Sequence, residues 1–521
     1  MKQRSSFFVN GLLLTAVAIL ARSVSLFFTA FVTASVGEEG IGLYTLLMTV
    51  YGFALTFATA GISLTVTRLV AAAIGEGDLS GVRRVLRASL FYATAFGTTA
   101  CVALFVLAPT LAEGVLGNAQ MAWPLRVLSL SLLPEALGAV LVGYFVGVRR
   151  VVGNAAAQMV TQGFKILVTC LFIGRVSAYG APYACLFLAT VSFATDLFGF
   201  LFQGARFLID RRQGAERTVG DSPRRTGTMR AVIGMALPLG LSAYIRSALL
   251  TVEHALIPMC LRMRGESVAE SLASYGLLHA MTLPILLFPI AALTSFSSLL
   301  VPEFAEARAA GRSDRLSRIT SRAVRATLMY AIAFAVLMTV FAEELGFCLY
   351  GSYEVGYYLS HMAWVLPLMY LDHVTDAMLK GIGEQVYSMW VNISDACLSV
   401  LLVRVLIPRM GIGGYALVIV VMEGFNFALS FLRLRQRIAF SVRPLSSFVL
   451  TAIAALTAAC LSRRLFSMNG SATTPLWLWW KMLFALCILL GTWLLLSTIA
   501  SADRRRRGKE PSFSLRHGGI D

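Results

Sequence analysis

The sequence predicts an all-α membrane protein with fourteen transmembrane helices, and three observations lead to this prediction. Of the 521 residues, 58% are hydrophobic and only 14% are charged. The mean hydropathy is +0.76, which is far above the range of soluble domains. Fourteen apolar stretches are long enough to cross a bilayer as helices.

The predicted spans follow one another with short connections. The first apolar stretch is too long for a signal peptide and has no clear small-residue cleavage site, so we interpret it as a span. Prolines cluster in the seventh and eighth spans and predict bends there, although ordinary Pro-kinked membrane helices are the alternative. They are Pro238, Pro258, Pro284, Pro289 and Pro302. The spans begin near Phe7, Gly42, Ala88, Trp123, Val152, Pro182, Ala231, Leu272, Ala323, Tyr357, Ser388, Gly411, Leu445 and Leu476.

The distribution of basic residues predicts the orientation of the chain. The net charge is +17, but most Lys and Arg residues lie in segments that are cytoplasmic if the N-terminus is inside. This is the positive-inside asymmetry, so both termini are expected in the cytoplasm and no nucleic-acid partner is indicated. The basic residues expected outside are Arg175, Arg262, Arg264, Arg409, Arg463 and Arg464.

An internal duplication predicts two parallel lobes. The pattern R-x-x-R-A-x-L-x-Y-A occurs at Arg84 to Ala93 and again at Arg322 to Ala331. Six predicted spans separate the copies, and because six is even, both copies have the same orientation. We expect an N-lobe of helices 1–6 (1–206), a basic cytoplasmic linker (207–230), a C-lobe of helices 7–12 (231–437), helices 13–14 (438–500) and a basic cytoplasmic tail (501–521).

Three cations lie at the centres of predicted spans. Arg22, Lys165 and Arg246 each lie midway along an apolar stretch. A charge at this depth costs about 2.5–3.5 kcal/mol, so it is expected to face water or a partner. We therefore predict a hydrated cavity that takes an anionic substrate.

Two further sets of residues join this predicted binding site. Gln158, Gln162 and Lys165 share one helix face, which favours a cavity lining, although an interhelical hydrogen-bond ladder is the alternative. Arg68 lies near the cytoplasmic end of the second span, where snorkelling also explains it.

Acidic and imidazole side chains within the spans are candidates for binding Na⁺ or a proton. The alternative is that they only neutralise the cations, and the sequence leaves both open. The candidates are Glu253, His254, Asp372, Asp376, Asn392 and Asp395, with weaker cases at Glu135, Asp196, His279 and Glu423.

No catalytic, nucleotide-binding or metal-binding motif is present in the sequence. The eight cysteines are scattered without a C-x-x-C pair. We therefore expect a transporter rather than an enzyme, with no cofactor and no firm metal site.

Several polar blocks resemble a known family. The runs Gly40 to Tyr44, Thr59 to Ser63, Gly143 to Gly147 and Leu300 to Ala307 are similar to the stage V sporulation protein B group of polysaccharide transporters. That group belongs to the multidrug/oligosaccharidyl-lipid/polysaccharide (MOP) flippase superfamily, with the lipid II flippases and the MATE transporters.

The resemblance implies two six-helix lobes around a central cavity and the export of undecaprenyl-diphosphate-linked sugars. It also implies a functional arginine at Arg22 and a groove for the polyprenyl tail in the last two helices. A family sodium site draws on spans seven, eleven and twelve, but Asn392 and Asp395 here are three positions apart rather than four.

The sequence and the resemblance together predict a flippase of the bacterial cytoplasmic membrane. Its partners would be a lipid-linked sugar, such as lipid II or a related wall, capsule or sporulation precursor, and membrane lipids, and we expect a monomer. The membrane potential, at about 2.3 kcal/mol per charge per 100 mV, or a cation gradient would drive transport. The alternatives are a cation-coupled multidrug antiporter, whose cavity would be rich in acids and aromatics, and a non-transporting scaffold.

Overall fold

The computed structural model describes residues 2–76, 78–148, 150–214, 228–440 and 445–467, and within them the structure has helices and no strand. This confirms the all-α prediction. The first seven helices along the chain are α1 (Lys2–Thr59), α2 (Ile62–Gly75), α3 (Leu79–Gly114), α4 (Ala122–Gly147), α5 (Val151–Val176), α6 (Ala181–Gly214) and α7 (Thr228–Met263). They are followed by α8 (Val268–Gly276), α9 (Leu283–Leu286), α10 (Ile290–Ala309), α11 (Ser313–Val340), α12 (Ala342–Tyr350), α13 (Tyr353–Met362), α14 (Leu366–Gly381), α15 (Gln385–Met410), α16 (Ile412–Arg437) and α17 (Leu445–Ser467).

The helices confirm a multi-pass membrane protein. Among the described residues, nine helical segments are long and apolar enough to cross a membrane, or ten if a bent pair counts as one span. The first segment has 57 residues, about 85 Å at 1.5 Å per residue, whereas a bilayer core is about 30 Å thick. Its break at Gly37 (φ 79°) lies between the first two predicted spans. The total of fourteen stays a prediction, because the span expected from Leu476 lies outside the described residues.

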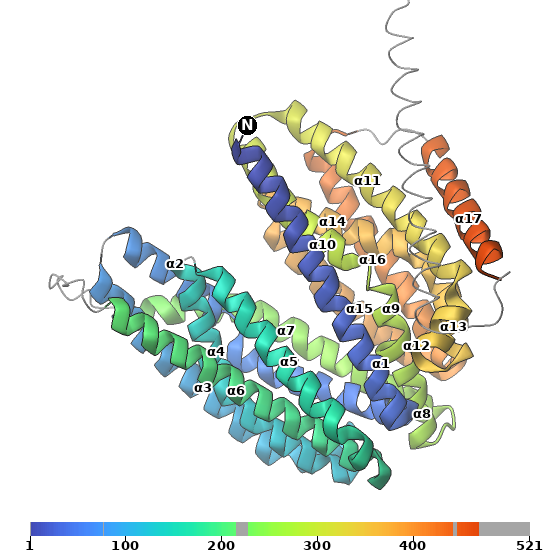
Figure 1. Ribbon diagram of the computed structural model, residues 1–521, viewed down its shortest axis with the longest axis horizontal. Coiled ribbons are helices and arrows are strands. Elements are labelled where there is room, and N and C mark those ends of the chain that lie inside the picture. The colour runs from blue at the N-terminus through green and yellow to red at the C-terminus, as the bar shows by residue number, and fades with distance from the viewer. Residues whose placement is uncertain (1, 77, 149, 215–227, 441–444, 468–521) are drawn as a thin grey trace, which may run out of the picture.

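The helices pack into two groups (Figure 1). In one group α4 packs against α2, α3 and α6, and α5 packs against α6; in the other, α14 packs against α10, α11 and α16. Helices α1 and α7 contact both groups, and the N-terminal part of α1 lies beside α10 (Figure 1). The predicted lobe boundaries therefore stay a prediction, and the tail and most of the linker lie outside the described residues.

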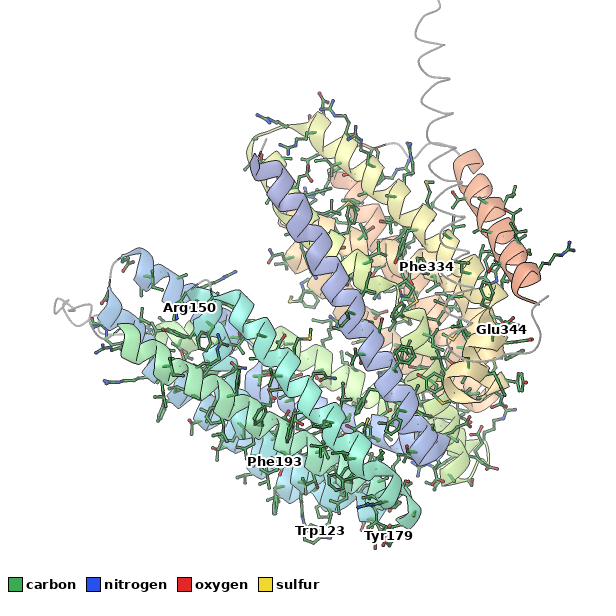
Figure 2. The ribbon with its side chains drawn as sticks, in the orientation of Figure 1. Trp123, Arg150, Tyr179, Phe193, Phe334 and Glu344 are labelled. Carbon is green, nitrogen blue, oxygen red and sulfur yellow. The ribbon has the colours of Figure 1, made fainter. Side chains whose placement is uncertain are left out.

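Large aromatic and basic side chains mark opposite ends of the first group. Trp123 and Tyr179 are 62% and 75% exposed and lie at one end of the helices, whereas Arg150 lies near the other (Figure 2). Aromatic rings favour the membrane–water interface, and Arg favours the cytoplasmic side. The orientation of the chain in the membrane stays a prediction.

The two groups meet along a seam formed by the C-terminal half of α1 against α7 and α8. A Cβ added at Gly276 of α8 would lie 2.7 Å from Glu38 O and 2.9 Å from Gly42 Cα in α1. Further along, Ser247 Oγ donates to Thr56 Oγ1 at 3.2 Å. Small residues allow this close approach of helix backbones.

The predicted bend of the eighth span is present, whereas the seventh span forms the continuous helix α7 through Pro238 and Pro258. Segments Val268–Leu286 and Ile290–Ser297 meet at 57°. The break frees backbone carbonyls, and neighbouring helices satisfy two of them: Tyr370 Oη of α14 donates to Leu286 O at 2.9 Å, and Tyr330 Oη of α11 donates to Pro289 O at 2.8 Å. Irregular backbone at membrane depth is tolerated when its polar groups are bonded in this way.

Candidate functional site

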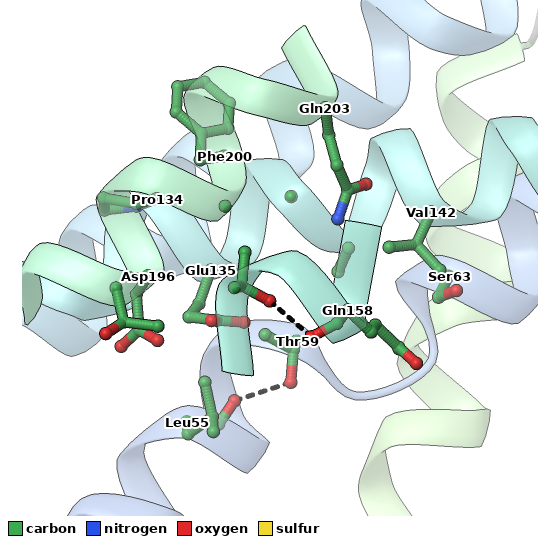
Figure 3. A pocket seen from close by; sticks show the side chains of 15 residues that line it. Leu55, Thr59, Ser63, Pro134, Glu135, Val142, Gln158, Asp196, Phe200 and Gln203 are labelled. Carbon is green, nitrogen blue, oxygen red and sulfur yellow. Dashed lines mark hydrogen bonds between the residues drawn. The ribbon is translucent and has the colours of Figure 1, made fainter. Parts of the chain in front are cut away.

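A polar cavity of about 400 Å³ lies within the first group of helices, between α1, α2, α4, α5 and α6 (Figure 3). Its apolar lining includes Leu55, Pro134 and Phe200. Six uncharged polar side chains also line it: Thr59, Ser63, Gln158, Thr161, Thr195 and Gln203. Such a mixed wall suits a ligand that needs several hydrogen bonds.

Two carboxylates line the same cavity, Glu135 from α4 and Asp196 from α6 (Figure 3). Both are half-buried and interact electrostatically with each other, and Lys165 of α5 acts on Asp196. Tyr51 also lies close to Asp196. Two like charges within a low-dielectric surround repel each other, so a bound cation or a proton would stabilise this pair.

The structure separates the predicted central cations. Lys165 is half-buried and interacts electrostatically with Asp196, whereas Arg246 of α7 is exposed and interacts electrostatically with Asp395 of α15. Arg22 of α1 is half-buried and has no hydrogen bond or ion pair with any described residue. None of the three lines the cavity, so their common chamber stays a prediction.

Of the other predicted binding residues, one lines the cavity and two do not. Gln158 lines the cavity, but Gln162, one turn further along α5, does not, and it is exposed. Arg68 of α2 is exposed and has no ion pair with the described residues. Only one of the six predicted substrate-binding side chains therefore lines this cavity.

A second cluster of acids lies between α7, α14, α15 and α16. Asp395 acts electrostatically on Glu253, Asp372 and Glu423, so four helices bring one carboxylate each to this place. One carboxylate oxygen of Asp372 and one of Asp395 are buried without a hydrogen-bond partner. Within the described residues, however, no group of three or more His, Cys, Asp or Glu has the geometry to hold a metal ion.

The remaining predicted coupling residues form local bonds. Asp376 is paired with Lys380 one turn along α14, with 2.5 Å between Oδ2 and Nζ. Asn392 Nδ2 donates to Ser388 O at 2.7 Å. His254 Nδ1 lies 2.8 Å from Tyr275 Oη. For Asp376, the structure favours the alternative that the carboxylate neutralises a cation.

His254 also belongs to a buried aromatic cluster with His279. Their ring centroids are 4.2 Å apart, and Tyr275 stacks on His279 at 5.3 Å. His279 lies in a π-helix, Leu277–Thr282, that continues α8.

Sequence reasoning gave too little weight to Glu135 and Asp196. Each is a lone acid within its own span, so neither shows the i, i+4 spacing that singled out Asp372 and Asp376. The available signal was Lys165: a cation in the middle of a neighbouring span is expected to have a counter-charge, and these acids were candidates to supply it.

Two family profiles match the chain. The polysaccharide biosynthesis protein family matches residues 7–307, more than half of the sequence, and the MatE family matches residues 254–405.

Named relatives and solved structures agree with these matches. Stage V sporulation protein B of Bacillus subtilis strain 168 is 24% identical over 420 residues, covering 80% of this chain and 81% of the relative. Lipid II flippase MurJ of the same organism is 22% identical over 384 residues, covering 68% and 69%.

Among solved structures, lipid II flippase MurJ in an inward closed conformation has a TM-score of 0.68 at 12% identity, over 94% of this chain and 99% of that one. An inward-facing MATE family transporter of the MOP superfamily has a TM-score of 0.63 at 16% identity, over 81% and 98%. Both structural similarities show a shared fold.

Proposed function

The chain belongs to the polysaccharide biosynthesis protein family, and from this premise we propose that it is a flippase that carries a lipid-linked sugar precursor outward across the bacterial cytoplasmic membrane. The resemblance to the stage V sporulation protein B group and to the MOP superfamily is confirmed by the relatives. A transporter rather than an enzyme, acting as a monomer with both termini in the cytoplasm, is part of this proposal.

The observation that carries the proposal is the unpaired Arg22. It lies in the middle of an apolar stretch and has no acid partner among the described residues, whereas Lys165 and Arg246 each interact electrostatically with a carboxylate. A guanidinium binds phosphate through two parallel hydrogen bonds. We assign to Arg22 the binding of the diphosphate of an undecaprenyl-linked sugar such as lipid II.

In this proposal, acidic side chains bind the ion whose gradient is coupled to transport. Glu135 and Asp196 line a cavity, and Asp372 and Asp395 have unbonded oxygens; either pair would bind Na⁺ or a proton. The membrane potential adds about 2.3 kcal/mol per uncompensated charge per 100 mV in the outward direction for an anion. The two helix groups would then alternate access by moving along the seam of α1 against α7 and α8.

The test is flipping of a fluorescent lipid-linked sugar in reconstituted vesicles. Arg22→Ala is expected to reduce flipping at least tenfold, because the diphosphate loses its guanidinium partner. Arg83→Ala is the matched control, since Arg83 is an exposed arginine at the start of α3. Both variants should melt as the parent does. Normal flipping by the folded Arg22→Ala protein contradicts the assignment.

One observation favours the cation-coupled multidrug antiporter as the second candidate. The cavity is lined by two acids and by no Lys or Arg, and this is the lining expected for organic cations. The MatE profile also matches residues 254–405. This candidate predicts resistance of cells to organic cations, lost in Asp196→Asn, with no flipping of lipid-linked sugars.

A further inference from the structure

Three arginines form a stripe on the outer face of α11. Arg318, Arg322 and Arg325 follow an i, i+4, i+7 spacing, which places them on one side of a helix. Arg318 and Arg322 are exposed and Arg325 is half-buried. The opposite side of α11 is the one that packs into the protein, through Thr320, Val324, Thr327 and other buried residues.

The stripe lacks the acidic partners that other arginines near the same end of the molecule have. Arg315 bonds to Glu303 and Glu306, and Arg433 bonds to Glu384. No described residue forms an ion pair or a hydrogen bond with the three stripe arginines, and the Nε of Arg325 is buried without an acceptor. An unbonded guanidinium nitrogen away from water requires an acceptor.

The internal repeat provides a direct comparison. Arg84 of α3 occupies the position of Arg322 in the first copy of the repeated pattern. Arg84 bonds to Asp78 at 2.7 Å and to Ser80 at 2.8 Å. The second copy keeps the arginine and an acid, Asp314, but Arg322 forms no ion pair or hydrogen bond with a described carboxylate, so its guanidinium remains available to a ligand.

The length of α11 sets the depth of the stripe. Helix α11 has 28 residues, whereas a bilayer core of about 30 Å needs about 20 residues. If the last ~20 residues of α11, which end at Val340, cross the bilayer core, the core begins near Ser321. Arg318 then lies just outside the core, Arg322 at its boundary and Arg325 one turn inside, from where its side chain reaches back toward the headgroups.

We propose that Arg318, Arg322 and Arg325 bind the phosphate of an anionic phospholipid in the adjacent leaflet. Below them the same helix face continues with the half-buried apolar residues Met329 and Ile332, which would contact the acyl chains. Helix α17, which lies beside α11 (Figure 1), would form the side wall. The buried Nε of Arg325 gains a phosphate oxygen as its acceptor. This site is separate from transport and does not depend on the proposed substrate.

The experiment counts lipids bound to the purified full-length protein by native mass spectrometry, with phosphatidylglycerol or phosphatidylcholine added. We expect the triple variant R318Q/R322Q/R325Q to retain at least fivefold less phosphatidylglycerol than the parent, with phosphatidylcholine unchanged. The control R83Q/R87Q/R312Q removes the same charge from exposed arginines elsewhere at this end and should retain phosphatidylglycerol as the parent does.

Three outcomes overturn the proposal. Equal loss in the control and the stripe variant would mean diffuse attraction by net charge, and unchanged retention in the stripe variant would mean that no site exists. Stronger retention of undecaprenyl phosphate than of phosphatidylglycerol, lost in the same variant, would assign the stripe to the transported lipid instead. If the triple variant does not fold, Arg322→Gln alone should show a smaller loss in the same direction.

Discussion

Replacing Gly276 by alanine tests the seam between the two helix groups. The added Cβ would lie 2.7 Å from Glu38 O, whereas ordinary contacts of a Cβ begin at 3.4 Å. The backbones of α1 and α8 must therefore separate by about 0.7 Å, since neither contacting atom belongs to a flexible side chain. Overpacking of this kind costs about 1–3 kcal/mol.

Thermal melting in detergent measures this cost, and Gly52→Ala is the matched control. Gly52 lies in the same half of α1, but a Cβ there would meet nothing within 4 Å. Alanine is the better helix former by about 0.5–1 kcal/mol, so the control should melt at or above the parent temperature. Gly276→Ala should melt lower and flip lipid more slowly. Equal melting of the two variants would refute the assignment of the seam as a close backbone contact.

Three further predictions concern separate parts of the molecule. Tyr370→Phe leaves Leu286 O without its donor and should lower stability to unfolding by about 1–3 kcal/mol, measured by melting; an unchanged melting temperature would show that another donor replaces it. Hydrogen bonding and the charge of Arg433 hold the pKa of Glu384 below its usual value of 4.5, so the stabilisation is present above that pH and is lost as the pH falls through the lowered pKa; melting of Glu384→Gln against pH should lack this loss, and a parallel profile would contradict it. Glu135→Gln should abolish any dependence of transport on the cation gradient, measured in vesicles with and without the gradient, and a retained dependence would assign coupling to the second acid cluster.

Much of the fold was predictable from apolar length alone. The stretches beginning at Ala88, Trp123 and Ser388 lie within helices α3, α4 and α15, because twenty apolar residues in a bilayer have few alternatives to a helix. Pro289 likewise predicted the bend in the eighth span. The packing of α1 and α7 against both groups was not predictable, because a repeat in the sequence does not fix where its copies make contact.

The candidate site was predicted only in part. Gln158 was found from its helical spacing, since periodicity shows which face of a helix is polar. The electrostatic interactions of Lys165 with Asp196 and of Arg246 with Asp395 depend on which helices are neighbours, and spacing within one helix carries no such information. Glu423 was only a weaker candidate in the sequence, although Asp372 of α14 and Asp395 of α15 interact with it electrostatically.

The two tyrosine bonds at the break between α9 and α10 have a mechanical consequence. Tyr370 and Tyr330 connect the bend in this span to α14 and α11 through hydrogen bonds. Straightening the bend would break both hydrogen bonds. The bend between α9 and α10 should therefore move together with α14 and α11 as one rigid unit. A large rearrangement is then expected to pivot elsewhere, and the breaks at Gly37 and Gly61, where φ is positive, are two places in the chain that could absorb it.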